Sequence, residues 1–303
     1  MQGEPSVLLG LIGYGIQGSL TPAMHEQEAA EQGLRCVYRM IDLERLGLGA
    51  AALGELITAA ERMGFAGLNI TFPCKQAALP LLDALSPDAR AVGAVNTVLL
   101  RDGRRIGHNT DVSGFAESFR RGFPDVPRQR VVQIGAGGAG AAVAHALLAL
   151  GAGEVTVFDL DPTRATNLAA ALVGRFGNSR AIAGGDPGRA IERADGLVNA
   201  TPVGMRSFPG LPVPAETLRP ELWVADVIYV PIETALLARA RALGCRTLDG
   251  GGMAVFQAVS AFELFTGRRA DAGRMRRHFE MLRGDAAANR EERAQARSTS
   301  SIL

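Results

Sequence analysis

Three short segments of the chain carry side chains that could perform chemistry together. Asn-Ile-Thr-Phe-Pro-Cys-Lys spans residues 69–75, His-Asn-Thr-Asp spans 108–111, and Gly-Ala-Gly-Gly-Ala-Gly spans 135–140. The first two supply amides, hydroxyls, one ammonium and one carboxylate, which could hold a polyhydroxylated acid and move a proton. The third could cradle the pyrophosphate of a dinucleotide. Taken in this order, the segments predict hydride transfer between a nicotinamide and a sugar-like alcohol.

The glycine-rich segment has the G-x-G-x-x-G spacing of a dinucleotide site, between an apolar run and an Ala-rich run. The first glycine permits a tight turn, the second lets the backbone approach the pyrophosphate, and the third lets the helix pack close to the strand. Backbone N–H groups at the start of the helix would face the phosphates. The predicted cofactor loop is Gly135, Ala136, Gly137, Gly138, Ala139 and Gly140. The alternative is ordinary turn chemistry in a chain rich in Ala and Gly.

The residues after the next apolar run bear on the type of dinucleotide. Asp159 lies about 20 residues past the glycines, where a carboxylate would bind a ribose diol and repel a 2′-phosphate. Asp161 adds a second negative charge, whereas Arg164 could reach a phosphate. Alternatively, the two aspartates cap the helix that is expected to start at Pro162, a role that suits Asp161 better. These residues predict NAD rather than NADP.

Lys75 and Asp111 are candidates for proton transfer. Each follows a predicted strand and is expected to open a helix, and ligands bind at the carboxyl ends of strands in open α/β sheets. A lysine in such a place can act as an acid or a base, and a nearby carboxylate would hold it in position. The alternatives are a solvated surface charge for Lys75 and a helix N-cap for Asp111.

Composition restricts the class of protein. The 303 residues, 47% of them hydrophobic, allow two domains. A net charge of +1 and an aromatic content of 5% argue against a nucleic-acid partner. The three cysteines have no metal-ligand spacing and the histidines form no metal motif, so no metal is expected. We expect reduced thiols, no signal peptide, no membrane span, a cytoplasmic location and, as one option, a homo-oligomer.

Alternating apolar and helical patterns predict two α/β units. In the first unit, strands are expected over residues 7–12, 36–41, 65–71, 95–100 and 104–108, with Asp102-Gly103 as a hairpin turn and helices over 22–33, up to 63, and after Pro73 to about Leu85. In the second, strands are expected over 130–134, 154–158, 181–183, 196–200, 223–228 and 246–248, with helices over 141–150 and 162–176 among others. This second pattern is a doubly wound, Rossmann-type fold.

The predicted fold class is therefore α/β with two α/β domains and an active-site cleft between them. Residues 1–112 form the N-terminal substrate-binding domain, and 113–249 form the Rossmann-type NAD-binding domain. Residues 250–284 are helices that pack back on the substrate domain, including one over 253–266. Residues 285–303, rich in Ala, Arg, Glu, Gln and Ser, form a tail that we expect to be disordered.

The chain resembles the shikimate dehydrogenase family, specifically its NAD-linked quinate/shikimate branch. The resemblance rests on six ordered segments: Asn-Ile-Thr-x-Pro-x-Lys, Gly-Ala-Val-Asn-Thr (93–97), His-Asn-Thr-Asp, the glycine segment, Asn-Ala-Thr-Pro-x-Gly-Met (199–205) and Gly-Met-x-x-x-Gln (252–257). It runs from about Gly10 to Phe279. It implies quinate and shikimate as substrates and NAD as cofactor.

The resemblance also implies roles for individual residues. Lys75 and Asp111 match the catalytic pair of the family. The residues implied to bind the substrate are Ser19 and Thr21 at its carboxylate, Tyr229 nearby, and Asn69, Thr71, Asn96 and Gln257 at its ring hydroxyls. The residues implied to line the cofactor pocket, besides the glycine loop, are Asp159, Arg164, Thr201, Met205, Val227 and Gly250.

Three departures from the family pattern refine this reading. Ser-Leu-Thr replaces the Ser-x-Ser of many shikimate-only members, and Phe-Asp-Leu-Asp replaces the Asn-Arg-Thr of NADP-dependent members. Both departures favour the NAD-linked quinate/shikimate branch. Phe72 and Cys74 replace a histidine and an aromatic residue, which we interpret as packing changes. The alternatives are a biosynthetic NADP-linked shikimate dehydrogenase and a non-catalytic sensor of NAD or quinate on the same fold.

Overall fold

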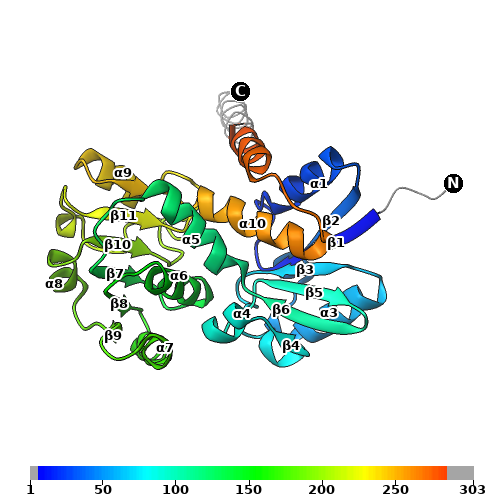
Figure 1. The fold of residues 1–303 in the computed structure, drawn as a ribbon, viewed down its shortest axis with the longest axis horizontal. Coiled ribbons are helices and arrows are strands. Elements are labelled where there is room, and N and C mark those ends of the chain that lie inside the picture. The colour runs from blue at the N-terminus through cyan, green and yellow to red at the C-terminus, as the bar shows by residue number, and fades with distance from the viewer. Residues whose placement is uncertain (1–5, 285–303) are drawn as a thin grey trace, which may run out of the picture.

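The computed structural model describes residues 6–284, which form two β-sheets with helices packed around them (Figure 1). The first sheet has the strand order β2-β1-β3-β5-β6-β4. Its strands are β1 (Ser6–Gly13), β2 (Arg35–Asp42), β3 (Gly67–Ile70), β4 (Ala84–Leu85), β5 (Thr97–Arg101) and β6 (Arg104–His108). Strands β1, β2 and β3 are parallel, whereas β5 runs antiparallel to both β3 and β6.

The helices of this unit start and end where the sequence supplies caps. They are α1 (Thr21–Glu31), α2 (Leu43–Leu46), α3 (Leu53–Arg62) and α4 (Pro87–Val92), with short 3-10 turns η1 (Ala50–Ala52) and η2 (Leu79–Leu81). The Ser86 hydroxyl accepts a hydrogen bond from the Ala89 N–H at the start of α4, and Gly93 ends that helix with a φ of 65°. Gly47, with a φ of 65°, separates α2 from the elements that follow.

The predicted hairpin at Asp102-Gly103 is confirmed. It joins β5 to β6, and its two residues have φ values of 53° and 69°. Two successive positive φ values are the geometry that an Asp-Gly turn adopts between antiparallel strands.

The predicted helix after Pro73 is wrong, and Lys75 does not open a helix. Residues 73–78 form turns, followed by η2 and the two-residue strand β4. Pro80 lies within η2, and a proline in a helix interior would remove a hydrogen bond and collide with the preceding turn. The segment therefore crosses the edge of the sheet as a series of turns that carry Lys75.

The second sheet is entirely parallel and has the strand order β12-β11-β10-β7-β8-β9. The prediction of a doubly wound fold is therefore confirmed. Its strands are β7 (Arg130–Ile134), β8 (Glu154–Phe158), β9 (Ala181–Ala183), β10 (Gly196–Asn199), β11 (Trp223–Asp226) and β12 (Thr247–Leu248). Its helices are α6 (Gly138–Ala149), α7 (Pro162–Phe176), α8 (Pro187–Glu192) and α9 (Ala235–Ala242), with the 3-10 turn η3 (Ala215–Thr217). The strand order reverses between β7 and β10, because β8 and β9 lie on one side of β7 and the later strands on the other, and this makes the carboxyl ends of β7 and β10 the expected ligand edge.

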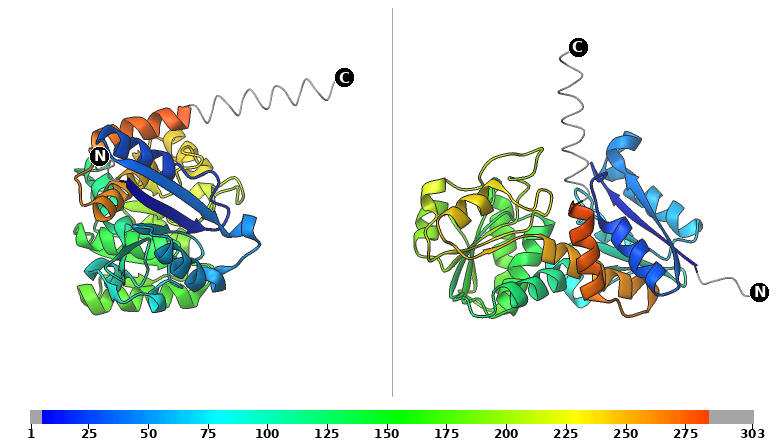
Figure 2. Two further views of the ribbon diagram at one scale, coloured as in Figure 1. Left: turned by 90° about the vertical axis from the view of Figure 1, so that its right-hand side faces the viewer. Right: turned by 90° about the horizontal axis from the view of Figure 1, so that it is seen from above.

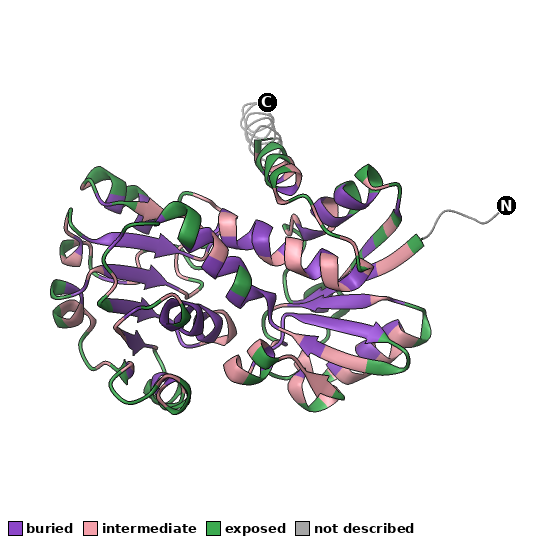
Figure 3. Cartoon of the chain, viewed as in Figure 1, coloured by how far each residue is buried: buried purple, intermediate pink, exposed green. Residues whose placement is uncertain are grey.

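Helices α5 (Thr110–Gly122) and α10 (Gly251–Thr266) connect the two units and pack against each other (Figure 1). Their contact is close because a Cβ at Gly114 would lie 2.9 Å from the Met253 carbonyl oxygen, and one at Gly252 would lie 2.2 Å from the Ser118 Oγ. The right-hand view of Figure 2 shows the sheets as separate lobes with these helices between them. Buried residues follow the central strands and the facing sides of α5 and α10 (Figure 3).

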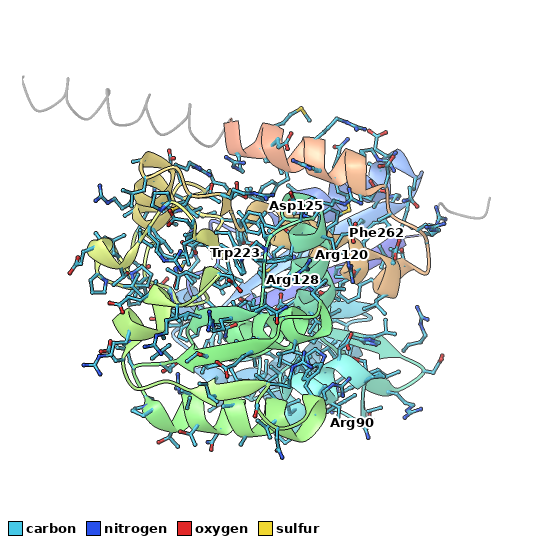
Figure 4. All side chains as sticks on the ribbon, turned by 60° about the vertical axis from the view of Figure 1, so that its left-hand side comes forward. Arg90, Arg120, Asp125, Arg128, Trp223 and Phe262 are labelled. Atoms are coloured by element: carbon cyan, nitrogen blue, oxygen red, sulfur yellow. The ribbon has the colours of Figure 1, made fainter. Side chains whose placement is uncertain are left out.

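An aromatic cluster fixes α5 to the second sheet. The ring of Trp223 on β11 makes an edge contact with Phe119, at a centroid distance of 5.2 Å, and a tilted one with Phe123, at 5.4 Å. The Trp223 indole N–H donates to the Pro127 carbonyl at 2.7 Å, and the Arg128 guanidinium lies 5.7 Å from the Phe119 ring centre. Figure 4 labels Trp223 and Arg128 beside this helix.

Helix α10 also packs on the first sheet. Ala261 and Phe265 belong to a hydrophobic cluster with Leu9, Leu11 and Leu99 of that sheet. Residues 272–284 are helical as well, and Met275 and Phe279 pack against α10. The predicted boundary between residues 112 and 113 falls inside α5, and the predicted tail 285–303 lies outside the described residues.

Candidate active site

Lys75 and Asp111 form an ion pair. The Lys75 Nζ lies 2.5 Å from the Asp111 Oδ2, and the two side chains are 17% and 7% exposed. Lys75 comes from the turn after β3, and Asp111 from the first turn of α5. Lys75 is also the only lysine of the chain, because the other 31 of its 32 basic Lys and Arg residues are arginines. It is therefore the one side chain of this group that can readily lose its proton.

Asp111 is held by the end of β6 and by the segment before β5. Its Oδ1 accepts a hydrogen bond from the Asn96 Nδ2 at 3.0 Å, and the same amide donates to the Thr110 Oγ1 at 2.8 Å. The N-cap of α5 is Asn109, whose Oδ1 accepts from the N–H of Asp111 at 3.1 Å. The cap interpretation of Asp111 is therefore wrong, and its carboxylate is free to face Lys75.

Asn69, at the end of β3, is fixed by a buried network. Its Oδ1 accepts from the Tyr38 hydroxyl at 2.6 Å, and its Nδ2 donates to the Asn96 carbonyl at 3.2 Å and to the Thr97 Oγ1 at 3.1 Å. Both N–H groups of Asn69 are thus used within the protein, and one lone pair of its oxygen remains to accept a hydrogen bond. Thr71 follows two residues later and packs against Gly13.

Ser19 and Thr21 lie in the turn that leads into α1. The Ser19 Oγ accepts from the Thr21 N–H at 3.3 Å. The side chain of Ser19 lies near that of Tyr229, although Tyr229 follows β11 of the second sheet. Burial raises the pKa of the Tyr229 phenol above its ordinary value, and the contact with Ser19 opposes that rise. Gln257 lies on α10, where its Nε2 donates to the Ala254 carbonyl at 3.0 Å.

The glycine loop has the geometry that its spacing predicts. Gly135 has a φ of 108°, and a Cβ there would lie 2.6 Å from the Ala200 carbonyl oxygen. A Cβ at Gly140 would lie 2.2 Å from the Gly135 carbonyl oxygen, so neither position accepts a side chain. The buried Gln133 fixes the loop further, because its Nε2 donates to the carbonyls of both glycines at 2.8 Å.

The glycine loop lies directly against Lys75. A Cβ built on Gly138 would lie 3.3 Å from both the Cβ and the Cδ of Lys75. Around Gly137 a Cβ would meet nothing within 4 Å, so the backbone there is open on that side. The first turn of α6 therefore lies beside the Lys75–Asp111 pair, and its open glycines suit a dinucleotide pyrophosphate.

Asp159 and Asp161 have separate roles at the end of β8. The Asp159 Oδ2 accepts from the Ala136 N–H of the glycine loop at 2.7 Å. Asp161 is the N-cap of α7 and accepts from the Thr163 N–H at 2.9 Å, as its sequence position predicted. Arg164 is 65% exposed and pairs with Asp161 at 3.7 Å. Asp159 is thus the carboxylate that lies beside the glycine loop.

Four further predicted cofactor residues follow β10, β11 and β12. The Thr201 Cγ2 would lie 3.0 Å from a Cβ on Gly135, which brings Thr201 to the glycine loop. Val227 and Gly250 adjoin, because a Cβ on Gly250 would lie 2.2 Å from the Val227 carbonyl oxygen. Met205 is 38% exposed and is the member of this set least tied to the others.

The two departures in the Lys75 segment differ in environment. Cys74 is fully buried in the hydrophobic core of the first unit, as expected for a packing change. Phe72 is 73% exposed, so its interpretation as a packing change is wrong.

Among residues 6–284, no cluster of His, Cys, Asp and Glu has the composition to hold a metal ion. No helix in that range is both long and apolar enough to cross a membrane.

Sequence reasoning missed several residues that support the site. Tyr38, Gln133 and Asp226 orient predicted site residues from other strands, and nothing in their local sequence marks them. No role was predicted for Thr110 of the His-Asn-Thr-Asp segment, although its hydroxyl accepts a hydrogen bond from the Asn96 side chain.

His25 supports Tyr38 and gives a pH-dependent prediction for stability. It is fully buried, its ring lies 5.0 Å from that of Tyr38, and burial lowers its pKa to about 4. Between pH 4 and its ordinary value of 6.5, the unfolded chain binds a proton that the folded chain excludes. The free energy of unfolding should therefore fall by about 3 kcal/mol as pH drops through this window.

The measurement is chemical denaturation of the wild type and of His25→Phe at several pH values. The variant should lack this part of the acid destabilisation, whatever its stability at neutral pH. The same pH slope in both proteins would contradict the assignment to His25.

Fold and site together define a two-unit α/β protein. The glycine loop of its parallel, Rossmann-type sheet lies beside Lys75 and Asp111, which follow strands of the mixed sheet. Known proteins resemble the chain in sequence and in fold. The family model for the shikimate dehydrogenase substrate binding domain matches residues 11–98, and that for the shikimate 5′-dehydrogenase C-terminal domain matches residues 250–278.

Individual relatives match over nearly the whole chain. The NADP(+) shikimate dehydrogenase of Streptomyces avermitilis is 60% identical over 286 residues, which cover 94% of this chain and 98% of the relative. The NAD(+) quinate/shikimate dehydrogenase of Corynebacterium efficiens is 53% identical, over 91% and 99% of the two chains. The structure of quinate dehydrogenase from Corynebacterium glutamicum with NAD has a TM-score of 0.84 at 49% identity, over 92% and 100%. The chain belongs to the shikimate dehydrogenase family of oxidoreductases.

Proposed function

We propose that the protein is an NAD-dependent quinate/shikimate dehydrogenase. It would interconvert quinate with 3-dehydroquinate, and shikimate with 3-dehydroshikimate. The observation that carries the proposal is the contact between Gly138 of the nucleotide loop and the side chain of Lys75. This contact puts a dinucleotide cradle beside the one lysine of the chain and its carboxylate partner, as a coupled proton and hydride transfer requires.

Lys75, as the neutral amine, accepts the proton of the ring hydroxyl that is oxidised and becomes the ammonium. Asp111, 2.5 Å away, holds the Lys75 ammonium in place, and Asn96 and Asn109 in turn hold Asp111. A nicotinamide, when bound, supplies the hydride chemistry. The protein contributes orientation and proton transfer, since proximity alone removes a large part of such a barrier.

The remaining predicted residues bind the acid. Ser19 and Thr21 bind its carboxylate and Tyr229 lies beside them, which the proximity of the Ser19 and Tyr229 side chains supports. The ring hydroxyls contact Asn69, Thr71, Asn96 and Gln257. Asn69 acts as an acceptor there, because both of its N–H groups are already used. A site of fixed polar groups rejects analogues that lack a matching hydroxyl.

Residues 135–140 would hold the dinucleotide, and Thr201, Met205, Val227 and Gly250 would line its nicotinamide end. Asp159 binds the adenosine ribose diol. Its bond to the Ala136 N–H supports this role, because it puts the carboxylate at the edge of the pyrophosphate loop. Residues 1–112 would thus bind the substrate, 113–249 the cofactor, and 250–284 would complete the first unit.

A second candidate is a biosynthetic, NADP-linked shikimate dehydrogenase. One observation favours it: the relative from Streptomyces avermitilis that is 60% identical carries that name. Arg164 is the cation that could meet a 2′-phosphate, although it pairs with Asp161. Asp159 opposes this candidate, because its negative charge would lie beside the phosphate.

The proposed function is tested by incubating the purified protein with quinate and NAD. The expected result is equimolar formation of reduced nicotinamide, followed by near-UV absorbance, and of 3-dehydroquinate, identified by mass spectrometry. Tight binding of NAD or quinate without turnover would instead make the protein a sensor and refute the proposal.

Thr21 is predicted to influence the choice between the two acids. Thr21→Ser should lower the ratio of kcat/KM for quinate to that for shikimate by roughly tenfold. Quinate carries an extra hydroxyl on the carbon that bears the carboxylate, and the branched threonine holds its own hydroxyl in a narrower range of χ1 than serine does. Steady-state rates with both acids measure the ratio, and Ser113→Ala, which changes an exposed hydroxyl on α5, is the control. An unchanged ratio would remove Thr21 from substrate choice.

A further inference from the structure

A buried polar network joins the ends of β10 and β11. Asn199 and Asp226 are the last residues of these neighbouring parallel strands and face each other in register. The Asp226 Oδ1 accepts from the Asn199 Nδ2 at 3.1 Å and from the Ile228 N–H at 3.0 Å, and its Oδ2 accepts from the Thr234 Oγ1 at 2.8 Å. Asn199, Asp226 and Thr234 are 0%, 2% and 1% exposed.

The network fixes the loop that follows each strand. The Asn199 Oδ1 accepts from both the N–H and the Oγ1 of Thr201, at 3.1 and 2.7 Å, and its Nδ2 also donates to the Val203 carbonyl at 2.9 Å. Gly204, with a φ of 115°, lets the two loops touch, because a Cβ there would lie 3.1 Å from the Ile228 Cδ1 and 3.3 Å from the Thr234 Cβ. The loops over residues 200–205 and 227–234 are therefore one packed unit.

These two loops carry residues of the proposed cofactor and substrate pocket. Thr201 packs against Gly135 of the glycine loop, and Val227 donates its N–H to the Asn199 carbonyl at 3.0 Å. Tyr229, next to Ile228, reaches Ser19 on the other unit. A shift of Asp226 would therefore move residues on the nicotinamide side of the site.

Asp226 is a carboxylate with no cation to balance it. No Lys, Arg or His of the described chain forms an ion pair with it, and burial raises its pKa to about 6. An uncompensated buried charge is unfavourable, so stability alone would favour a neutral residue. Three donors converge on this side chain, however, and an asparagine would turn an NH₂ group toward one of them. The carboxylate is thus the group that can hold both loops at once.

We propose that Asp226 is a positioning residue that holds the loops 200–205 and 227–234 in the conformation that binds the nicotinamide end of the dinucleotide. This inference rests on the proposed function, because it takes that edge of the second sheet as the cofactor site. It assigns to Asp226 no contact with substrate or cofactor. Its effect passes through Asn199, Thr201 and Val227.

The test compares Asp226→Asn with the wild type by isothermal titration with NAD and with NADP, and by steady-state kinetics. The preferred dinucleotide should bind about tenfold more weakly to the variant, because the asparagine NH₂ group cannot accept from Thr234, whose hydroxyl would lose the partner that it donates to. The KM for the dinucleotide should rise by a similar factor, and the KM for the acid should change less.

Two matched variants separate positioning from simple loss of stability. Glu28→Gln breaks another buried carboxylate network, which holds Arg274 at 2.7 Å, and should lower Tm without changing dinucleotide binding. Thr234→Val removes the hydroxyl that donates to Asp226 and should weaken dinucleotide binding, whereas Thr234→Ser retains the hydroxyl and should restore it. The comparison of Thr234→Val with Thr234→Ser can be measured even if the Asp226 variant fails to fold.

The outcomes distinguish the inference from the proposed function. If the wild type binds neither dinucleotide, the proposed function fails. If the wild type binds one, but Asp226→Asn and Thr234→Val bind it as tightly while their Tm falls like that of Glu28→Gln, the network is merely structural and the inference is overturned.

Discussion

Replacement of Lys75 by alanine is expected to lower kcat by about 10³-fold while changing the KM of either acid much less. The reason is that the Lys75 side chain, whose Nζ lies 2.5 Å from the Asp111 Oδ2, accepts the hydroxyl proton and so acts chiefly while that proton is leaving. Steady-state kinetics at saturating NAD measures the effect. A loss confined to KM would assign Lys75 to substrate binding instead of to proton transfer.

Lys75→Arg is the matched control, because it keeps the positive charge and the pairing with Asp111 but cannot readily release a proton. It should be nearly as inactive as the alanine variant. Recovery of substantial activity in Lys75→Arg would mean that the site needs only a charge there. Since the chain has one lysine, an amine-selective reagent at mildly alkaline pH should inactivate the enzyme through Lys75, and bound substrate should protect it.

Replacement of Asp159 by serine is expected to lower the ratio of kcat/KM for NAD to that for NADP by about 100-fold. The variant loses a charge-assisted hydrogen bond to the ribose diol and also the repulsion of a 2′-phosphate. Kinetics with both dinucleotides at saturating acid gives the ratio. The variant also loses the bond to the Ala136 N–H, so a moderate fall in the rate with both cofactors is compatible with the prediction.

Asp161→Ser is the matched control for Asp159. It changes the neighbouring aspartate, which caps α7, to another good cap residue, so it should leave both Tm and the cofactor ratio nearly unchanged. If Asp161→Ser shifted the cofactor ratio as far as Asp159→Ser, the effect would come from the net charge of this loop and not from a ribose contact.

The order of strands and helices could be predicted from the sequence wherever apolar runs alternate with caps and glycines. The glycine loop, the Asp102-Gly103 turn and the cap at Asp161 are all local signals, and all three were confirmed. The segment after Pro73 could not be predicted in this way. Its apolar spacing resembles a helix, but Pro80 and the pairing of β4 with β6, which is a contact distant in sequence, decide its path.

The same distinction between local signals and contacts distant in sequence applies to the site residues. Lys75, Asp111 and Asn96 belong to recognisable segments, and the structure brings them into one hydrogen-bonded group. Tyr38 and Asp226 carry no such signal, because their importance comes from strand neighbours that only the folded sheet brings together. Local pattern therefore predicts which groups gather at the candidate site better than it predicts which groups hold them in place.

The most direct test of the account is a comparison of initial rates for four pairings: quinate or shikimate, each with NAD or NADP, at mildly alkaline pH. The account predicts turnover of both acids with NAD and little with NADP. Turnover of shikimate alone with NADP would contradict it, and would show that neither Asp159 nor the Ser19–Thr21 segment has the role proposed for it.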